Sequence, residues 1–139
     1  MTKIIEEVYS VKVEKDPESG AVISQTWFNQ KGKQENLNGP SHIEFDISTG
    51  EPIVQQWMVD GDYHRDEREG PARISKIPGD GYRTDEFCWK GERHRMAGPA
   101  TIAYVEETGE ILKAEYFNNG REYDPGVEIR NPEPQALKL

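Results

Sequence analysis

Two histidine–arginine pairs are the residues of this chain whose types and spacing could support chemistry. His64-Arg65 and His94-Arg95 are 30 residues apart, so stacked hairpins would bring them side by side at one edge of a sheet. Acidic residues lie near both pairs in the sequence: Asp62, Asp66 and Glu92. Imidazole and carboxylate groups are ordinary ligands of divalent metal ions, so a metal site is one hypothesis for these loops.

The sequence around the pairs repeats, and the repeat favours a structural interpretation. An aromatic residue recurs at intervals of 30, 30 and 29 residues: Trp27, Trp57, Phe87 and Tyr116. Each is followed by a glycine, at positions 32, 61, 91 and 120, and Gly-Pro pairs stand at 39–40, 70–71 and 98–99. A period of roughly 20–50 residues is typical of repeat architectures, where apparent motifs are consensus positions. We therefore expect the pairs to be structural first and binding contacts second, and we predict no metal.

Other catalytic arrangements are missing from the sequence. Acidic residues come close together at 44 and 46, 85 and 86, and 106 and 107, but a glycosidase needs two acids facing each other across a cleft. The sequence has no phosphate-binding loop, nucleophile elbow, dinucleotide fingerprint or metalloprotease motif. Its one cysteine, Cys88, and its three histidines show no nucleophile–base spacing. We predict that the protein is not an enzyme and needs no cofactor.

Composition and charge narrow the choice of partners. The formal charge of −9 argues against binding to nucleic acid or to anionic lipid, both of which require clustered Lys and Arg. An acidic surface would suit a basic protein partner. Only 34% of the residues are hydrophobic, which favours a thin sheet over a thick two-layer core. The single cysteine and the absence of an apolar leader predict a cytoplasmic protein.

Alternating residues after each Gly-Pro pair predict β-strands. Ile43, Phe45 and Ile47 alternate with polar residues, which is the pattern of a half-buried antiparallel strand. Glycine-containing turns follow at 16–20, 48–50, 78–81 and 107–109, and return strands are expected at 22–28, 53–59, 82–89 and 111–117. Longer polar loops, at 29–38, 60–69 and 90–97, join the hairpins.

These elements predict an all-β fold. We expect one elongated, twisted antiparallel sheet of stacked β-hairpins with about ten strands, forming a single domain over residues 1–130. Residues 131–139 are predicted to be an extended tail, because two prolines and polar residues begin it. The edge strands are expected at 8–13 and near 123–129. The repeated aromatic residues are expected to form a ladder across the hairpins.

The repeating unit resembles the MORN-type repeat. The residues that carry the resemblance are the aromatic, the glycine four residues later, the His-Arg pair and then Gly-Pro-Ala-x-Ile, most clearly at 57–74 and 87–102. The unit is still more similar to the variant found in bacterial proteins, some of which are antitoxin components. The resemblance covers residues 8–124 and implies a hairpin sheet that serves as a scaffold or protein-binding surface. Two places depart from it: Gln34-Glu35, where His-Arg is expected, and the turn at 78–81.

Together the sequence and the resemblance predict a non-catalytic protein that binds another protein. The most specific version is an antitoxin-like or immunity-like inhibitor of a basic protein. The alternatives are an acidic regulator of nucleic-acid-acting machinery, and a small-ligand or metal binder that uses the loops of His64 and His94. Association of two copies through a face or an edge strand is a further expectation. The candidate binding residues are His64, Arg65, His94, Arg95, Gln34 and Glu35.

Overall fold

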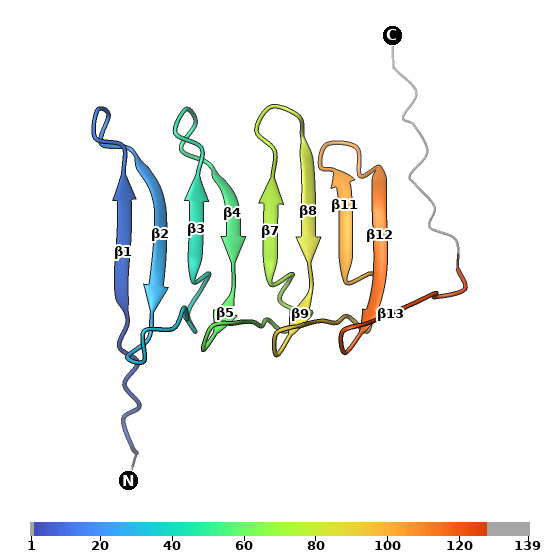
Figure 1. Cartoon of the computed structure of the whole chain (residues 1–139), viewed down its shortest axis with the longest axis horizontal. Coiled ribbons are helices and arrows are strands. Elements are labelled where there is room, and N and C mark those ends of the chain that lie inside the picture. Colours follow the sequence, from blue (N-terminus) through green and yellow to red (C-terminus); the bar gives the residue numbers. More distant parts are fainter. Residues whose placement is uncertain (1, 128–139) are drawn as a thin grey trace.

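The computed structural model describes residues 2–127, which form an antiparallel, all-β structure (Figure 1). These residues contain thirteen strands and no helix. Within them there is accordingly no helix that is long and apolar enough to cross a membrane. The strands are β1 (Ser10–Lys15), β2 (Val22–Phe28), β3 (His42–Phe45), β4 (Pro52–Gln56), β5 (Met58–Val59), β6 (Asp62–Tyr63), β7 (Arg73–Lys76), β8 (Tyr82–Glu86), β9 (Cys88–Trp89), β10 (Glu92–Arg93), β11 (Thr101–Val105), β12 (Ile111–Asn118) and β13 (Arg121–Tyr123).

Nine strands form one open sheet in the order β1-β2-β3-β4-β7-β8-β11-β12-β13. Each hairpin lies beside the next, as the repeat predicts, so the antiparallel hairpin sheet is confirmed. Two small ribbons, β5-β6 and β9-β10, continue the chain below the sheet. The predicted first strand at 8–13 is displaced to Ser10–Lys15. The predicted tail at 131–139 lies outside the described residues, and the predicted edge at 123–129 lies partly outside them.

Two predicted return strands are interrupted at their aromatic residue. The N–H of Trp57 donates to the carbonyl of Ala72, and the carbonyl of Trp57 accepts from the N–H of His64. Phe87 makes the equivalent bonds with Ala100 and His94. Trp27 makes the same two bonds, but β2 stays continuous there because Val11 of β1 pairs with Trp27. In the later hairpins β3 and β7 begin at His42 and Arg73, so neither strand has a residue that pairs with Trp57 or Phe87. The segments at 53–59 and 82–89 are therefore each split into two strands.

The two long edges of the sheet differ in construction. The turn edge, at the top of Figure 1, consists of the four short connections 16–21, 46–51, 77–81 and 106–110. The loop edge, at the bottom, consists of 29–41, 57–72, 87–100 and 119–124. Its ribbons reverse at Asp60-Gly61, Lys90-Gly91 and Asn119-Gly120, where both residues of each pair have positive φ. Such two-residue turns match the twist of a hairpin, and glycine adopts the second position without strain.

The sheet is one layer thick, and its buried apolar core is small. The buried hydrophobic residues within 2–127 are Ala72, Phe87, Cys88 and Ala100. Ser41, Ala72 and Ala100 are fully buried, and each accepts a backbone hydrogen bond from the repeat aromatic of the preceding hairpin. The aromatic rings therefore alternate with small residues. Ring–ring contacts within the described chain are His64 with Trp89 and Tyr116 with Tyr123, so the aromatic residues form no continuous stack.

Candidate functional site

The histidines of the repeat connect each loop to the next hairpin. Nδ1 of His64 accepts the N–H of Lys90 at 3.0 Å, and Nδ1 of His94 accepts the N–H of Asn119 at 3.0 Å. Both donors belong to residues with positive φ in the following turn. The ring of His64 also lies against Trp89, with 4.0 Å between ring centroids. Each imidazole thus fixes the turn of the next unit, and its Nδ1 lone pair is already engaged.

The arginines beside these histidines pack inside the loop edge. The guanidinium carbon of Arg65 lies 3.8 Å from the centre of the Trp57 ring, and that of Arg95 lies 3.9 Å from the centre of Phe87. Each also donates through Nη1 to a proline carbonyl, that of Pro71 at 3.0 Å or Pro99 at 3.1 Å. Burial lowers the pKa of Arg65, against the opposing charge of Glu69. These cation–π and carbonyl contacts stabilise the loop that leads into the next strand.

Packing of the arginine explains the glycine of the Gly-Pro pair. A Cβ atom at Gly70 would lie 2.6 Å from Nη1 of Arg65, and the φ angle of Gly70 is +143°. At Gly98 the corresponding atom would lie 3.3 Å from the guanidinium of Arg95, with φ at +155°. Both the space and the backbone conformation therefore require glycine at this point.

The first unit makes the same contacts with different residues. The pair that takes the place of His-Arg lies one position later than the predicted pair, Gln34-Glu35. Oε1 of Glu35 accepts the N–H of Asp60 at 3.0 Å, as the histidines do in later units. Nδ2 of Asn36 donates to the carbonyl of Pro40 at 3.1 Å, as the arginines do. Glu35-Asn36, rather than Gln34-Glu35, thus takes the place of His-Arg. Gln34 instead accepts a hydrogen bond from the Ser41 hydroxyl at 3.0 Å.

The loop edge is held together by its own polar residues. The carboxylate of Glu67 accepts the N–H groups of Met96 and Ala97 in the next loop, at 2.9 and 3.0 Å. No group of three His, Cys, Asp or Glu side chains in residues 2–127 is arranged to hold a metal ion. All six predicted binding residues lie in this edge, and their contacts are contacts within the chain. A role for them in binding a partner stays a prediction.

The turn edge has many more acidic than basic residues, a feature that the sequence alone did not lead us to predict. Its four connections contain eight acidic residues and no Lys, Arg or His: Asp16, Glu18, Asp46, Glu51, Asp80, Glu106, Glu107 and Glu110. The loop edge is almost balanced, with nine acidic and eight basic residues. The signal was visible in the sequence, since seven of the eight acids fall in or next to the predicted turns and Asp46 lies two residues before one. Only their collection at one edge required the topology.

Several turn-edge carboxylates are available to a partner. Asp16 and Asp46 accept hydrogen bonds within their own turns, and the bond from Ser19 lowers the pKa of Asp16. Glu106 pairs with Lys76 at 3.0 Å and with Arg83 at 3.3 Å. The other five acids are exposed, and no cation within the described chain pairs with them: Glu18, Glu51, Asp80, Glu107 and Glu110. Exposed isoleucines lie among them, Ile47 at 52% and Ile77 at 54%.

One face of the sheet, here called the aliphatic face, is open. Its central cross-strand row contains aliphatic residues that alternate with mostly polar ones along Val13, Gln25, Ile43, Gln55, Ile74, Asp85, Ile102 and Ala114. The aliphatic members are half-buried, apart from Val13, which is 43% exposed. Nothing within residues 2–127 packs over this row as a second layer.

A polar cluster lies where the aliphatic face meets the turn edge. Arg83 donates to Asp85 at 2.7 Å, and the Tyr104 hydroxyl donates to the other oxygen of Asp85 at 3.1 Å. Burial opposes the charge of Arg83, but the hydrogen bonds and charge of Asp85 outweigh it and raise the pKa of Arg83. Burial and the charge of Asp85 raise the pKa of Tyr104 to about 12. Both carboxylate oxygens of the buried Asp85 therefore accept hydrogen bonds within the chain.

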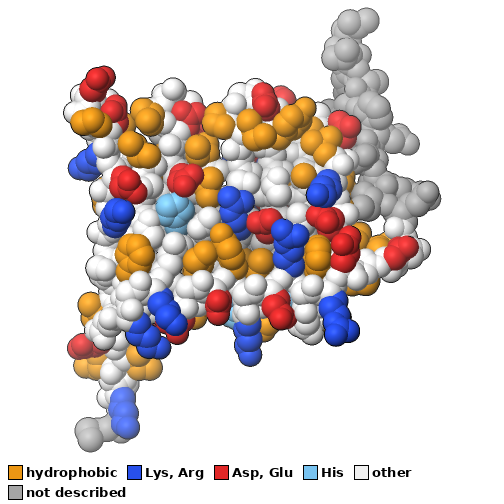
Figure 2. All heavy atoms as spheres, in the orientation of Figure 1, with side chains coloured by type: hydrophobic (Ala, Val, Ile, Leu, Met, Phe, Trp, Pro, Cys, Tyr) orange, Lys and Arg blue, Asp and Glu red, His pale blue; other side chains and the backbone are white. Residues whose placement is uncertain are grey.

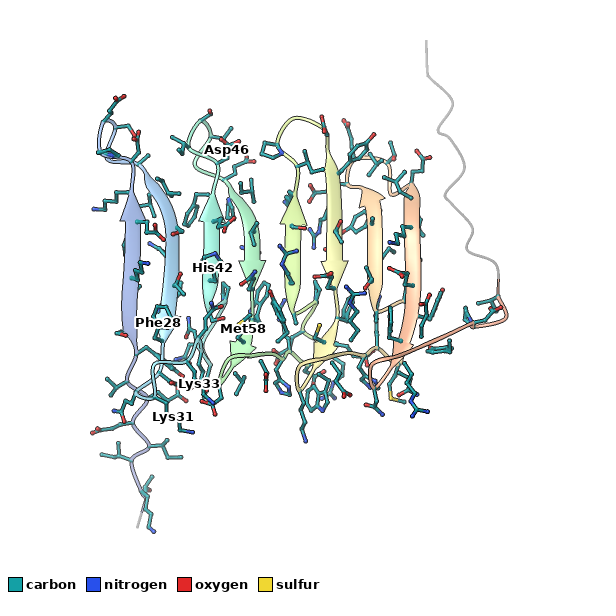
Figure 3. The ribbon with its side chains drawn as sticks, viewed as in Figure 1. Phe28, Lys31, Lys33, His42, Asp46 and Met58 are labelled. Carbon is teal, nitrogen blue, oxygen red and sulfur yellow. The ribbon has the colours of Figure 1, made fainter. Side chains whose placement is uncertain are left out.

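The opposite face, here called the charged face, is polar but internally paired. Figure 2 shows acidic and basic side chains across its middle, with His42, labelled in Figure 3, among them. Its ion pairs are Lys12–Glu14, His42–Glu44, Arg73–Glu86, Arg93–Glu86 and Lys113–Glu115. Because both signs are present in similar number, this face has little net field. The excess negative charge is concentrated at the turn edge, which runs along the top of both figures.

Comparison of the chain with protein-family models, with curated proteins and with solved structures finds no match.

Proposed function

We propose that this protein is a non-catalytic scaffold that binds a basic protein across its turn edge and aliphatic face. The observation that carries the proposal is the turn edge, where eight acidic residues occur without a basic one. Five exposed carboxylates there lack a cation partner within the described chain, so a partner's Lys and Arg side chains can approach them. Such a one-sign edge steers association electrostatically and makes it dependent on ionic strength.

The aliphatic face supplies the apolar contact that charge alone does not give. Ile43, Ile74 and Ile102 are half-buried in the free chain, and covering them would remove apolar surface from water at roughly 25 cal/mol per Å². Ile47 and Ile77 add exposed apolar surface within the turn edge itself. A partner segment that alternates basic and aliphatic side chains matches both features. The proposal thus favours a basic, strand-forming or loop segment as the bound element.

The most specific form of the proposal is an antitoxin-like or immunity-like inhibitor of a basic protein. It is supported by the resemblance of the repeats to MORN-variant repeats and by the acidic edge. This form of the proposal also places the protein in the cytoplasm, where the thiol of Cys88 stays reduced. That thiol is buried, and burial together with the charge of Glu86 raises its pKa to about 11. Nothing in the geometry of the His64 and His94 loops favours the metal-binding alternative.

A fluorescence-anisotropy titration with a labelled peptide of alternating lysine and valine tests the proposal. We expect saturable binding that weakens by about tenfold or more between low and physiological salt, because the Debye length shortens to about 8 Å. A peptide of alternating serine and valine serves as the uncharged comparison. Binding of both peptides with equal affinity, or of neither, would contradict the proposal.

Two variants with matched charge locate the binding. Changing Glu18, Glu51, Glu107 and Glu110 to Gln removes four charges from the turn edge, and changing Glu6, Glu69, Glu92 and Glu122 to Gln removes four elsewhere. Both variants have a formal charge of −5 instead of −9. The first should lose most of the binding and the second should keep most of it. A protein captured from source cells should then be identified, purified and measured with the same two variants.

A further inference from the structure

The sheet ends in the middle of a repeat at both of its sides. β1 occupies the slot of a strand that follows Gly-Pro, but no return strand precedes it. β12 is a return strand, and no Gly-Pro strand follows it within residues 2–127. β1 is the end strand on one side of the sheet (Figure 1). On the other side the short strand β13 pairs with Tyr116–Asn118 of β12, and within residues 2–127 no strand lies on the outer side of Lys113–Glu115. All six residues of β1 are exposed, and an unpaired strand edge is a template for another strand.

Neighbouring hairpins pair in one register throughout the sheet. The residue before the repeat aromatic always faces the residue two positions after the proline: Thr26 with His42, Gln56 with Arg73, and Glu86 with Thr101. Glu115 occupies the position before the repeat aromatic, because it precedes Tyr116. Lys12 occupies the position that in other hairpins lies two residues after the proline, because it pairs with Thr26 within its own hairpin as His42 pairs with Gln56.

This register makes the two free ends complementary in charge. If β1 of a second copy lies beside β12, Lys12 faces Glu115, Glu14 faces Lys113, and Val13 faces Ala114. Both charged pairs are of opposite sign, and both lie on the charged face. In the free chain Lys12 pairs with Glu14 at 3.9 Å and Lys113 pairs with Glu115 at 3.3 Å, each along its own strand, and Glu14 also accepts a hydrogen bond from the Ser24 hydroxyl at 3.1 Å. Cross-strand pairs of opposite charge stabilise antiparallel pairing, and like charges oppose it.

The outer side of β12 also has room for a neighbour. An open depression of about 560 Å³ lies there, between β12 and the segment after it. Ala114, Glu115 and Tyr116 line one side, and residues between Glu122 and Val127 line the other. Within the described chain, β11 is the only strand that pairs with Lys113–Glu115. The depression therefore lies along the edge to which the register assigns a second β1.

We propose that copies of this chain associate head to tail, with β1 of one copy extending the sheet beside β12 of the next. The interface is heterologous, since two different surfaces meet. It therefore leads to open, concentration-dependent chains rather than to a closed dimer. This proposal is independent of the proposed binding of a basic protein, because it uses β1, β12 and the charged face rather than the turn edge.

Sedimentation velocity on the full chain over a range of concentrations tests the association. We expect species heavier than the 15.9 kDa monomer that become more abundant with concentration. Two charge swaps then test the register, Lys12→Glu with Glu14→Lys at one end, and Lys113→Glu with Glu115→Lys at the other. Each swap keeps the net charge and, because it places like charges opposite each other, should weaken association by about tenfold or more.

The decisive experiment restores opposite charges between the two strands. The variant that carries both swaps, and an equimolar mixture of the two single-end variants, should regain the association of the unmodified chain. A protein that stays monomeric at every concentration, or a doubly swapped variant that stays as weak as the single-end variants, would overturn the proposal. Association that ignores both swaps but is abolished by Ile74→Lys would place the contact on the aliphatic face and would overturn it equally.

Discussion

The loop edge and the turn edge use similar residues for different purposes. At the loop edge, polar side chains reach the next unit: His64 to Lys90, Glu67 to Met96 and Ala97. At the turn edge, most polar contacts stay within one turn, as between Asp16 and Ser19. Acids and bases balance at the first edge, and only acids occur at the second. The comparison shows that the most catalytic-looking residues hold the stack together, while the less conspicuous acids remain available for binding.

The largest expected difference between the edges concerns glycine. Gly70→Ala should lower the free energy of unfolding by about 2–3 kcal/mol, because its Cβ would collide with Arg65 and its φ is strained for alanine. Gly50→Ala, in a turn with nothing within 4 Å of the new atom, should lower it by only about 1 kcal/mol. Urea unfolding of both variants measures the difference. Equal losses would remove the distinction in packing between the edges.

The histidines give the next largest effect. His64→Ala should destabilise the protein by about 1–2 kcal/mol, because Lys90 loses its acceptor and Trp89 loses a ring contact. His94→Ala should lose less, since His94 has no ring contact among residues 2–127, although Asn119 also loses its acceptor. Thermal melts with and without zinc provide the second measurement. The melting temperature should not change with zinc, and a rise that His64→Ala abolishes would support the metal-binding alternative.

Beside the turn edge, the Tyr104–Asp85 hydrogen bond joins β11 to β8, and its expected signature is a pH dependence of stability. The folded pKa of Tyr104 is raised from 10 to about 12, so the folded protein keeps a proton that the unfolded chain loses. This contribution to stability is present below pH 10 and is lost as the pH rises towards 12. Tyr104→Phe should cost about 1 kcal/mol at neutral pH and should flatten the decline between pH 10 and 12. The raised pKa of Cys88 adds the same decline in stability to the unmodified protein and to Tyr104→Phe. Equal slopes of stability against pH for the two proteins would contradict the raised pKa of Tyr104.

The smallest effect is expected for the unpaired acids. Changing Glu18, Glu51, Glu107 and Glu110 to Gln should alter the free energy of unfolding by no more than about 0.5 kcal/mol, because these side chains are exposed and have no cation partner in residues 2–127. Urea unfolding at two salt concentrations measures this. A loss comparable to that of His64→Ala would show that the turn edge is also structural.

The hairpin sheet could be predicted from the sequence because the residues of each unit determine its strands and turns locally. Alternation after Gly-Pro, together with glycine in the turns, is sufficient for strand β3 and strand β11. The breaks at Trp57 and Phe87 were not predictable, because they depend on where the partner strands β3 and β7 begin. The aromatic ladder was predicted from period alone, and the small residues that separate the rings, such as Ala72, come from the other strand of each pair.

The candidate site was predicted less well than the fold. Gln34-Glu35 was aligned with His-Arg by counting residues forward from Trp27. An extra residue in that loop moves the equivalent position to Glu35-Asn36. Counting back four residues from Pro40 and from Pro99 leads to Asn36 and Arg95, which make the same contact, whereas Arg65 lies six residues before Pro71. The acidic edge needed the topology, since only the sheet brings turns some thirty residues apart in sequence into one row.

The most direct test of the account is an NMR titration of the protein with the lysine–valine peptide. Amide chemical-shift changes should concentrate in the turn-edge segments 16–21, 46–51, 77–81 and 106–110, and at Ile43, Ile74 and Ile102 on the aliphatic face. Shift changes centred on His64-Arg65 and His94-Arg95 in the loop edge, or the absence of changes at saturating peptide, would contradict the division between a structural edge and a binding edge.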